Sequence, residues 1–177
     1  MSRLFVTGDT HCNACGEFSK LNAKNFPQQK DLTKDDFVVI AGDFGLLWCG
    51  SSEERYWLDW MEDKPFTTLF VDGNHENHAM LADFPVEEWH GGKIHRIRQS
   101  IIHLMRGQVF EDIAGLGVFS MGGASSHDIQ DGILDPDDSF FEEEYRKLRR
   151  RGAMFRVKGQ TWWPEELPSQ EEYAKAE

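Results

Sequence analysis

The chain has 177 residues, of which 40% are hydrophobic, and its formal net charge is -12. This length is enough for one domain with a sizeable core, and the composition is that of a globular protein. The acidic excess argues against a long nucleic acid as partner, because binding a phosphate backbone needs a basic face. No apolar run is long enough to span a membrane and the start lacks the layout of a signal peptide, so we expect a cytoplasmic protein with no membrane partner.

The cysteines are few and odd in number: Cys12, Cys15 and Cys49. This set is unlike the paired framework of a small secreted domain. A zinc site would need a second ligand pair beside Cys12 and Cys15, and a redox motif would need a helix directly after them. We therefore expect free thiols.

Three short apolar runs lack polar alternation and are rich in β-branched and aromatic residues: 4–6, 37–41 and 67–71. Such runs predict strands that are buried on both faces, as in a parallel sheet covered by helices. Between the second and third runs, residues 51–61 have an apolar stripe at helical spacing. This segment opens with the capping-box spacing of Ser51 and Glu54 and stops before Pro65, so it predicts a crossover helix.

Beyond residue 93 the sequence has closely spaced apolar segments separated by glycine-containing turns or polar residues: 94–97, 101–105, 109–113 and 116–121. This texture predicts a meander or a second, antiparallel sheet layer. Together with the buried runs before it, the pattern predicts an α/β sandwich.

A charged helix is predicted over residues 140–151, where acidic residues come first and basic residues last, as the helix dipole favours. Glu142 and Arg146 are four residues apart, as are Glu143 and Lys147, so each couple can form an ion pair. We interpret the basic cluster at the end of this segment as a solvated helix end rather than a phosphate-binding patch.

A further helix start lies close to the last residue, because Ser169 and Glu172 have capping-box spacing. The chain stops inside this helix, and we therefore expect a fold that is incomplete at its C-terminus. An uncovered sheet edge would then make self-association possible.

Each buried-strand candidate is followed at once by a glycine-containing turn with metal-ligand side chains: Gly8-Asp9-Thr10-His11, Gly42-Asp43-Phe44-Gly45 and Gly73-Asn74-His75-Glu76. Parallel strands end at one edge of the sheet, so the three turns should converge. Asp9 and His11 are one residue apart, and in an extended segment both would point to the same side. Asp43 has two oxygens and can bridge two cations, while the amide oxygen of Asn74 can bind the second. Oxygen and imidazole ligands together suit Mn²⁺, Fe or Zn²⁺.

The three motifs, in this order and each after a strand, resemble the first three motifs of the calcineurin-like metallophosphoesterase superfamily. The resemblance implies an α/β fold in which a metallophosphoesterase-type β-sandwich is flanked by helices. We expect a single domain over residues 1–177, truncated at its C-terminus. The remainder of the chain is compatible with that sandwich by its texture alone.

The resemblance also implies roles for the residues of these motifs. Asp9 and His11 would bind the first metal ion, Asp43 would bridge the two ions, and Asn74 would bind the second. His75 would be catalytic rather than a ligand, and would contact the phosphate or protonate the leaving oxygen.

The sequence departs from the superfamily pattern in two places. Leu46 stands three residues after Asp43, where the superfamily usually has an acidic residue or an arginine, so a substrate contact is lost or supplied elsewhere. The later histidine and the Gly-His-x-His motif that complete the superfamily site are not recognisable. His127 and His78 are possible additional site residues, with a loop position and a helix-surface position as the alternatives.

The leading hypothesis is a metal-dependent phosphoesterase that hydrolyses phosphate mono- or diesters with two metal ions and an activated water. Candidate substrates are phosphorylated small molecules, nucleotides and phosphoproteins. The alternative is a truncated or non-catalytic relative that acts as a metal- or phosphate-binding regulatory module, as the missing histidine motifs favour. A weaker alternative takes residues 74–78 as part of a nuclease hairpin, which leaves Asp9, His11 and Asp43 unexplained.

Overall fold

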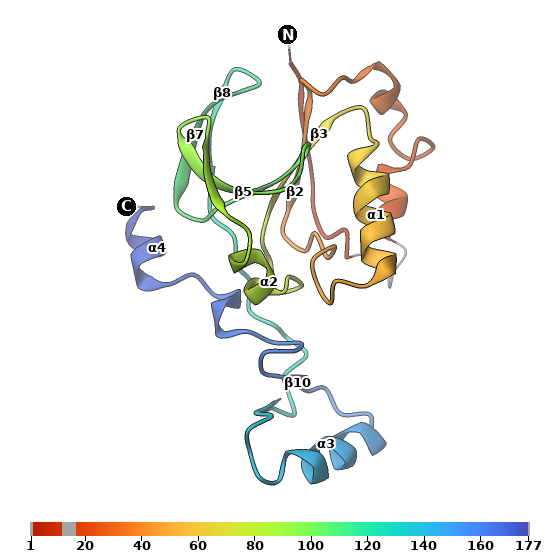
Figure 1. Cartoon of the computed structure of the whole chain (residues 1–177), viewed down its shortest axis with the longest axis vertical. Helices are drawn as coiled ribbons and strands as arrows, with labels where there is room; N and C mark the ends of the chain where they lie inside the picture. Colours follow the sequence, from red (N-terminus) through yellow and green to blue (C-terminus); the bar gives the residue numbers. More distant parts are fainter. Residues whose placement is uncertain (1, 12–16, 177) are drawn as a thin grey trace.

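The computed structural model describes residues 2–11 and 17–176. Its centre is a six-stranded sheet in the order β1-β2-β3-β6-β5-β4 (Figure 1). The strands of this sheet are β1 (Leu4–Thr7), β2 (Phe37–Ala41), β3 (Thr67–Val71), β4 (Val86–Trp89), β5 (Gly92–Arg98) and β6 (Ile101–Leu104). The first three match the predicted apolar runs, and they pair in parallel as predicted.

Both faces of the sheet are covered at β2 and β3, which explains why these two strands lack polar alternation. Ile40 and Phe70 pack on one face, and Leu69, next to Phe70, packs on the other with Phe110. All four side chains are fully buried. Burying an apolar side chain of this size contributes about 1.5–3 kcal/mol, so both layers hold the parallel strands in place.

Helix α1 (Ser52–Glu62) covers one face of the sheet, as predicted. Ser51 is its N-cap, and the Ser51 hydroxyl accepts a hydrogen bond from the Glu54 backbone N–H. The Glu54 carboxylate does not complete the predicted capping box. It is buried and accepts hydrogen bonds from the backbone N–H groups of Cys49 and Gly50, each at 2.8 Å, because these loop amides need acceptors at the helix start.

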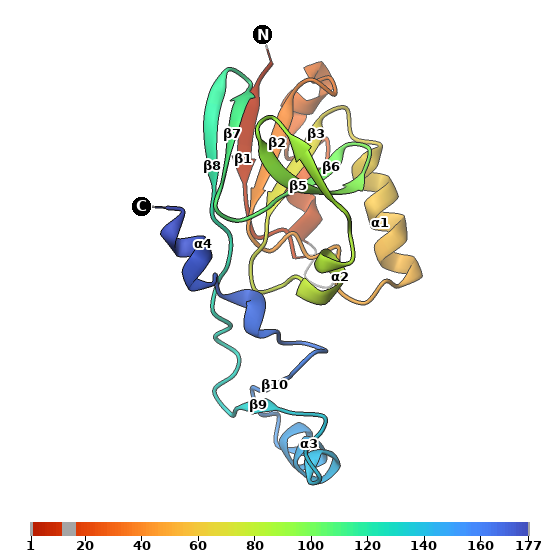
Figure 2. The same ribbon diagram turned by 60° about the vertical axis from the view of Figure 1, so that its left-hand side comes forward.

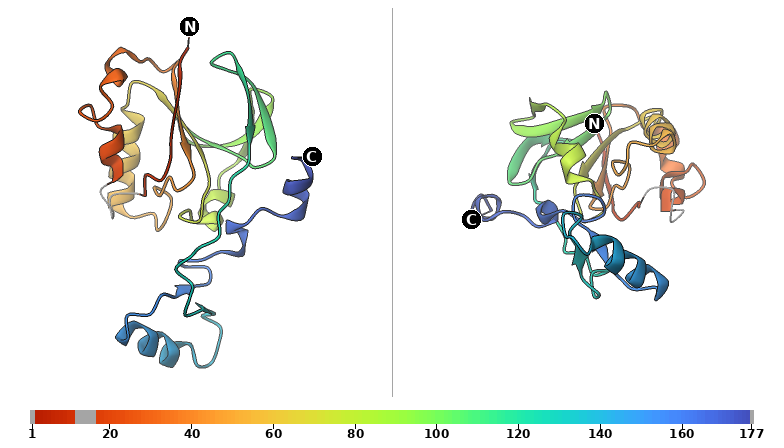
Figure 3. Two further views of the ribbon diagram at one scale, coloured as in Figure 1. Left: turned by 180° about the vertical axis from the view of Figure 1, so that it is seen from behind. Right: turned by 60° about the horizontal axis from the view of Figure 1, so that its bottom comes forward.

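The opposite face carries an antiparallel hairpin of β7 (Gln108–Ile113) and β8 (Leu116–Ser120). Figure 3 shows this hairpin and α1 on either side of the central sheet. The predicted second layer was therefore half right. Segments 94–97 and 101–105 belong to the central sheet instead, where β6 pairs in parallel with β3 and antiparallel with β5. All four residues of β6 are buried, as a strand covered on both faces requires.

After β8 the chain leaves the body of the molecule in a segment that we call the arm, residues 124–163. It contains β9 (Ile133–Leu134), α3 (Phe141–Arg150) and β10 (Arg156–Val157), and it projects away from the sheet in both views (Figures 1 and 2). The predicted charged helix is present. Arg146 pairs with Glu142 as expected, at 3.4 Å, whereas Lys147 pairs with Glu144 rather than Glu143 because the i,i+3 carboxylate lies within reach.

The remaining helices are short: η2 (Glu17–Leu21), η3 (Pro27–Asp31), α2 (His78–Ala82), η4 (Pro164–Glu166) and α4 (Gln170–Ala174). Helix α4 has the predicted capping box of Ser169 and Glu172. Cys49 is a free, exposed thiol, whereas Cys12 and Cys15 lie outside the described residues. Within those residues, every helix is too short or too polar to cross a bilayer.

Candidate metal centre

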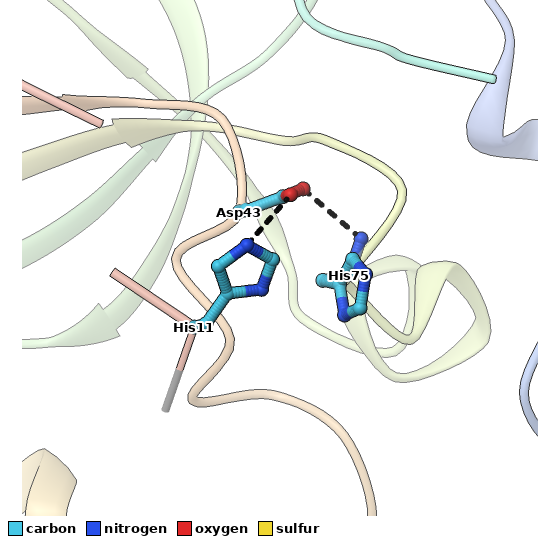
Figure 4. A group of neighbouring side chains, drawn as sticks. All are labelled: His11, Asp43 and His75. Atoms are coloured by element: carbon cyan, nitrogen blue, oxygen red, sulfur yellow. Dashed lines mark hydrogen bonds and ion pairs between the residues drawn. The ribbon is translucent and has the colours of Figure 1, made fainter. Parts of the chain in front are cut away.

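The turns after β1, β2 and β3 meet at the carboxyl edge of the sheet. His11, Asp43 and His75 each place one potential ligand atom there, and these atoms lie within 4.8 Å of one another (Figure 4). The Nε2 atom of His11 is 3.4 Å from Oδ2 of Asp43. The other oxygen, Oδ1, accepts a hydrogen bond from the backbone N–H of His75 at 3.2 Å. The two Asp43 oxygens thus face two different turns, as a bridging ligand requires.

Backbone strain is concentrated at this edge. Six non-glycine residues of the described chain have positive φ, and three of them are Asp9, His11 and Asp43. Such conformations cost on the order of 1–3 kcal/mol each and persist only where the surrounding structure enforces them. Here the backbone N–H groups of Thr10 and His11 both donate to the carbonyl oxygen of Asp43, each at 3.0 Å.

The left-handed backbone corrects one expectation. The segment that contains Asp9 and His11 was predicted to be extended, which would place both side chains on one side. Their side chains do meet, with Nε2 of His11 2.5 Å from Oδ1 of Asp9, but the meeting results from the turn that hydrogen bonds to Asp43 impose.

Gly73 allows the third turn to approach Asp43 closely. A Cβ atom at Gly73 would lie 2.0 Å from Oδ1 and 2.7 Å from the backbone nitrogen of Asp43. No side chain fits at that distance, so any larger residue must displace the carboxylate. The glycine of this motif is therefore required by close backbone approach rather than by a positive φ.

Asn74 is held by a chain of hydrogen bonds from the arm and η4. The Ser126 hydroxyl has a single hydrogen, which it donates to Oε2 of buried Glu166 at 2.6 Å. Ser126 can therefore only accept from Nδ2 of Asn74, at 3.3 Å. This arrangement fixes the amide orientation and leaves the Asn74 carbonyl oxygen as the group available to a metal ion.

The donor set fits a divalent cation. The structure groups His11, Asp43 and His75, whereas Asp9 contacts His11 but lies outside this group of three. Imidazole and carboxylate groups of this kind can hold a divalent metal ion. Two carboxylates approach the same nitrogen of His11, an arrangement that a shared cation would stabilise. A cavity of about 260 Å³, whose lining includes Asp9, Asp43 and Gly73, adjoins these groups.

Glu76 connects two of the turns by hydrogen bonds. It is fully buried, and its carboxyl oxygens accept hydrogen bonds from the backbone N–H groups of Gly45 and Gly73. Burial, reinforced by the negative charges of Asp72 and Asp43, raises the pKa of Glu76 to about 8 against the effect of the two N–H donors. Glu76 thus joins the second turn to the third.

A second polar network lies behind the third turn. Buried Asp72 pairs with Arg106, and its Oδ1 atom is 3.0 Å from Nε2 of His103. Nδ1 of His103 is in turn 3.1 Å from Nδ1 of His95. Burial alone would raise the pKa of Asp72, but the hydrogen bonds and charges of His103 and Arg106 outweigh it and hold the pKa at about 2. The network fixes the end of β3.

The two additional histidines of the sequence analysis are not in the ligand group of the described chain. His78 begins α2 and lines a neighbouring cavity of about 460 Å³ together with Asp72 and His103. His127 is exposed. Its neighbours Ser126 and Asp128, which sequence reasoning did not single out, make the contacts to Asn74 and to Arg156 instead.

Aromatic side chains border the centre. The Trp48 ring stacks on His75 with the ring centroids 6.1 Å apart, and it meets Trp163 edge-on at 5.3 Å. Trp48 lies five residues after Asp43 in the sequence. Trp163 is buried and belongs to the end of the arm.

Three strand-end turns place Asp, His and Asn side chains at one edge of a covered sheet, and side chains of these types can hold metal ions that act on a phosphoryl group. The sequence model of the family described as calcineurin-like phosphoesterase matches residues 2–175. The chain therefore belongs to the calcineurin-like phosphoesterase family. Comparison with curated proteins and with solved structures gives no match.

Proposed function

We propose that this chain binds two divalent metal ions, Mn²⁺, Fe or Zn²⁺, and hydrolyses phosphate mono- or diesters. The observation that best supports the proposal is that the proposed ligands His11 and Asp43 and the proposed catalytic residue His75 each place one atom within 4.8 Å of the others, in a member of the calcineurin-like phosphoesterase family. Phosphorylated small molecules, nucleotides and phosphoproteins are the proposed substrates.

The residues divide between the two ions. Asp9 and His11 would hold the first, Asn74 the second, and Asp43 would be shared because its two oxygens face different turns. When bound, such ions neutralise charge on the phosphoryl group and lower the pKa of a water molecule that serves as the nucleophile. The role of Ser126 and Glu166 is to keep the Asn74 oxygen available.

His75 is the proposed catalytic side chain. Burial lowers its pKa, the charge of Asp43 opposes this effect, and the charges of His11 and Arg156 add to it. The lowered pKa makes the imidazolium a stronger acid and also a smaller fraction of His75 near neutral pH, so protonation of a leaving alkoxide by His75 should be favoured on the acidic side of neutrality. Trp48 stacks on the ring and restricts its orientation.

The proposal is tested by elemental analysis of the protein after loading with Mn²⁺, combined with hydrolysis of an aryl phosphate and of its diester. We expect about two metal ions per chain and measurable hydrolysis. The Asp43→Ala variant should lose both, because it removes the shared ligand. Two bound ions without hydrolysis of either ester would refute the enzymatic part of the proposal.

A second candidate is a binding module that takes one metal ion or a phosphorylated ligand without turnover. The observation that favours it is the number of candidate metal sites. Among the described residues, His11, Asp43 and His75 form the single group of three or more His, Cys, Asp or Glu side chains that could hold one ion. One metal ion per chain, retained phosphate binding and no hydrolysis would support this candidate over the first.

A further inference from the structure

Arg156, the first residue of β10, reaches the candidate centre from the arm. Its Nη2 atom is 3.3 Å from Nε2 of His75, although the two residues are 81 positions apart. Its guanidinium carbon lies 5.7 Å from the centre of the Trp48 ring, within the range of a cation–π contact. The side chain is only 8% exposed, so its position is fixed by packing.

The guanidinium is oriented by partners on the arm itself. Its Nε and Nη2 atoms are 2.8 and 2.7 Å from Oδ2 of Asp128, and Nη1 donates to the carbonyl oxygen of Thr161 at 2.7 Å. A guanidinium has five N–H donors. Two are used by Asp128, one by Thr161 and one by His75, which leaves one on Nη1 without an acceptor among the described residues.

The centre is surrounded by negative charge, so a cationic side chain there can help an anion to bind. Carboxylates of Asp9, Asp43 and Asp128 lie around the centre and would repel an incoming anion. Leu46 is fully buried at the position where the superfamily usually has an acidic residue or an arginine. Leu46 offers no polar group to an anion, whereas Arg156 brings a cationic side chain next to His75 from a different part of the chain.

We propose that Arg156 binds the phosphoryl group of the substrate, together with His75. A phosphoryl oxygen placed between the two side chains would take over the Nη2 hydrogen that now points to Nε2 of His75, and would also accept from Nε2 when that nitrogen carries a proton; a second oxygen would accept from Nη1. Asp128 is then a positioning residue that keeps the plane of the guanidinium fixed. The inference rests on the proposed function for the nature of the ligand.

The test is equilibrium dialysis of inorganic phosphate against the Mn²⁺-loaded protein, with the metal content measured in the same samples. We expect Arg156→Ala to weaken phosphate binding roughly 10- to 100-fold, the range for lost charge-assisted hydrogen bonds, with unchanged metal content. Arg156→Lys should recover part of the affinity, because it keeps the charge but not the planar fork. Added guanidinium ion should restore binding to the alanine variant.

Arg151→Ala is the matched control. Arg151 belongs to the same arm and pairs with exposed Asp131, so its loss should leave phosphate binding unchanged. Thermal unfolding of each variant shows whether the arm stays folded, and Asp128→Asn provides a milder disturbance that should weaken binding less than Arg156→Ala.

The outcomes separate this inference from the proposed function. Wild-type affinity for phosphate in a folded Arg156→Ala variant would overturn the inference, even if the wild-type chain hydrolyses esters. No phosphate binding by the metal-loaded wild type would overturn both. Phosphate binding that depends on Arg156, without hydrolysis of any ester, would uphold the inference and refute the enzymatic proposal.

Discussion

The sheet and the arm bring residues to the same centre by different means. The ligands from the sheet follow directly after β1, β2 and β3, whose backbones are fixed by parallel pairing and by apolar layers on both faces. The arm has strands of only two residues, and its ion pairs include those of Arg151 with Asp131 and Lys158 with Asp135. The candidate metal ligands thus follow the strands of the sheet, whereas the proposed substrate contact comes from the arm.

The largest expected effect concerns the turn after β3, at the edge of the sheet. Gly73→Ala should lower the free energy of unfolding by about 2–4 kcal/mol and abolish metal binding, because its Cβ would overlap Asp43. Denaturant unfolding and elemental analysis measure the two effects. Gly117→Ala is the control, since a Cβ at this exposed position in β8 meets nothing within 4 Å. Similar behaviour of both variants would contradict the close-approach argument.

A smaller effect is expected where the two regions join. Ser126→Ala should weaken binding of the second metal ion roughly 10- to 100-fold, because Asn74 loses the hydrogen bond that fixes its amide. The affinity is measured by titration with Mn²⁺ in the presence of a competing chelator. Exposed Ser125 supplies the control, and Ser125→Ala should bind metal normally. Unchanged affinity in Ser126→Ala would mean that the arm does not orient the ligands.

The smallest expected effect concerns the network behind the third turn. Burial, with the charge of His103, lowers the pKa of His95 from 6.5 to about 4, so native His95 stays neutral where the unfolded chain takes up a proton. The contribution of His95 to stability should therefore fall as the pH drops from about 6.5 to about 4, by on the order of 1 kcal/mol. Glu76, whose pKa is raised to about 8, contributes in the opposite sense down to about pH 4.5, so the effect of His95 is the difference between the wild type and a variant without this histidine. Unfolding at a series of pH values measures this loss.

The matched variants for this experiment are His95→Phe and His127→Gln. The first removes the buried titrating ring, so its stability relative to the wild type should increase as the pH drops over that interval. The second removes an exposed histidine of the arm and should keep the wild-type profile. If both variants followed the wild type, the pH dependence would have to come from other groups.

The sheet could be predicted from the sequence because its signals are local. Runs such as 37–41 and 67–71 are apolar throughout, and the polar turns after them identify the edge at which ligands gather. The same signal does not tell which sheet a strand joins. Segments 94–97 and 101–105 would have the same apolar pattern in the central sheet and in a separate second layer. Only the pairing of β6 with β3 decides between these arrangements.

The contribution of the arm could not be predicted because it depends on tertiary contacts. Ser126 is 52 residues from Asn74 and Arg156 is 81 residues from His75, and neither stands in a recognisable motif. The sequence analysis noticed the right segment through His127, but the residues on either side of it make the contacts. A one-residue error of this kind is expected in a loop, where no periodicity tells which side chain faces inward.

The base of the arm is closed by Glu166. The carbonyl oxygen of Glu166 accepts from the backbone N–H of Ala124 at 3.0 Å, and its carboxylate accepts from the backbone N–H of Ser126 at 2.8 Å. The chain therefore leaves and re-enters the body at nearly one point, and β9 pairs with β10 just beyond it. Arg156 is held by this pairing and by Asp128, so we expect the tip between the strands to tolerate changes in length and charge as long as these contacts are kept.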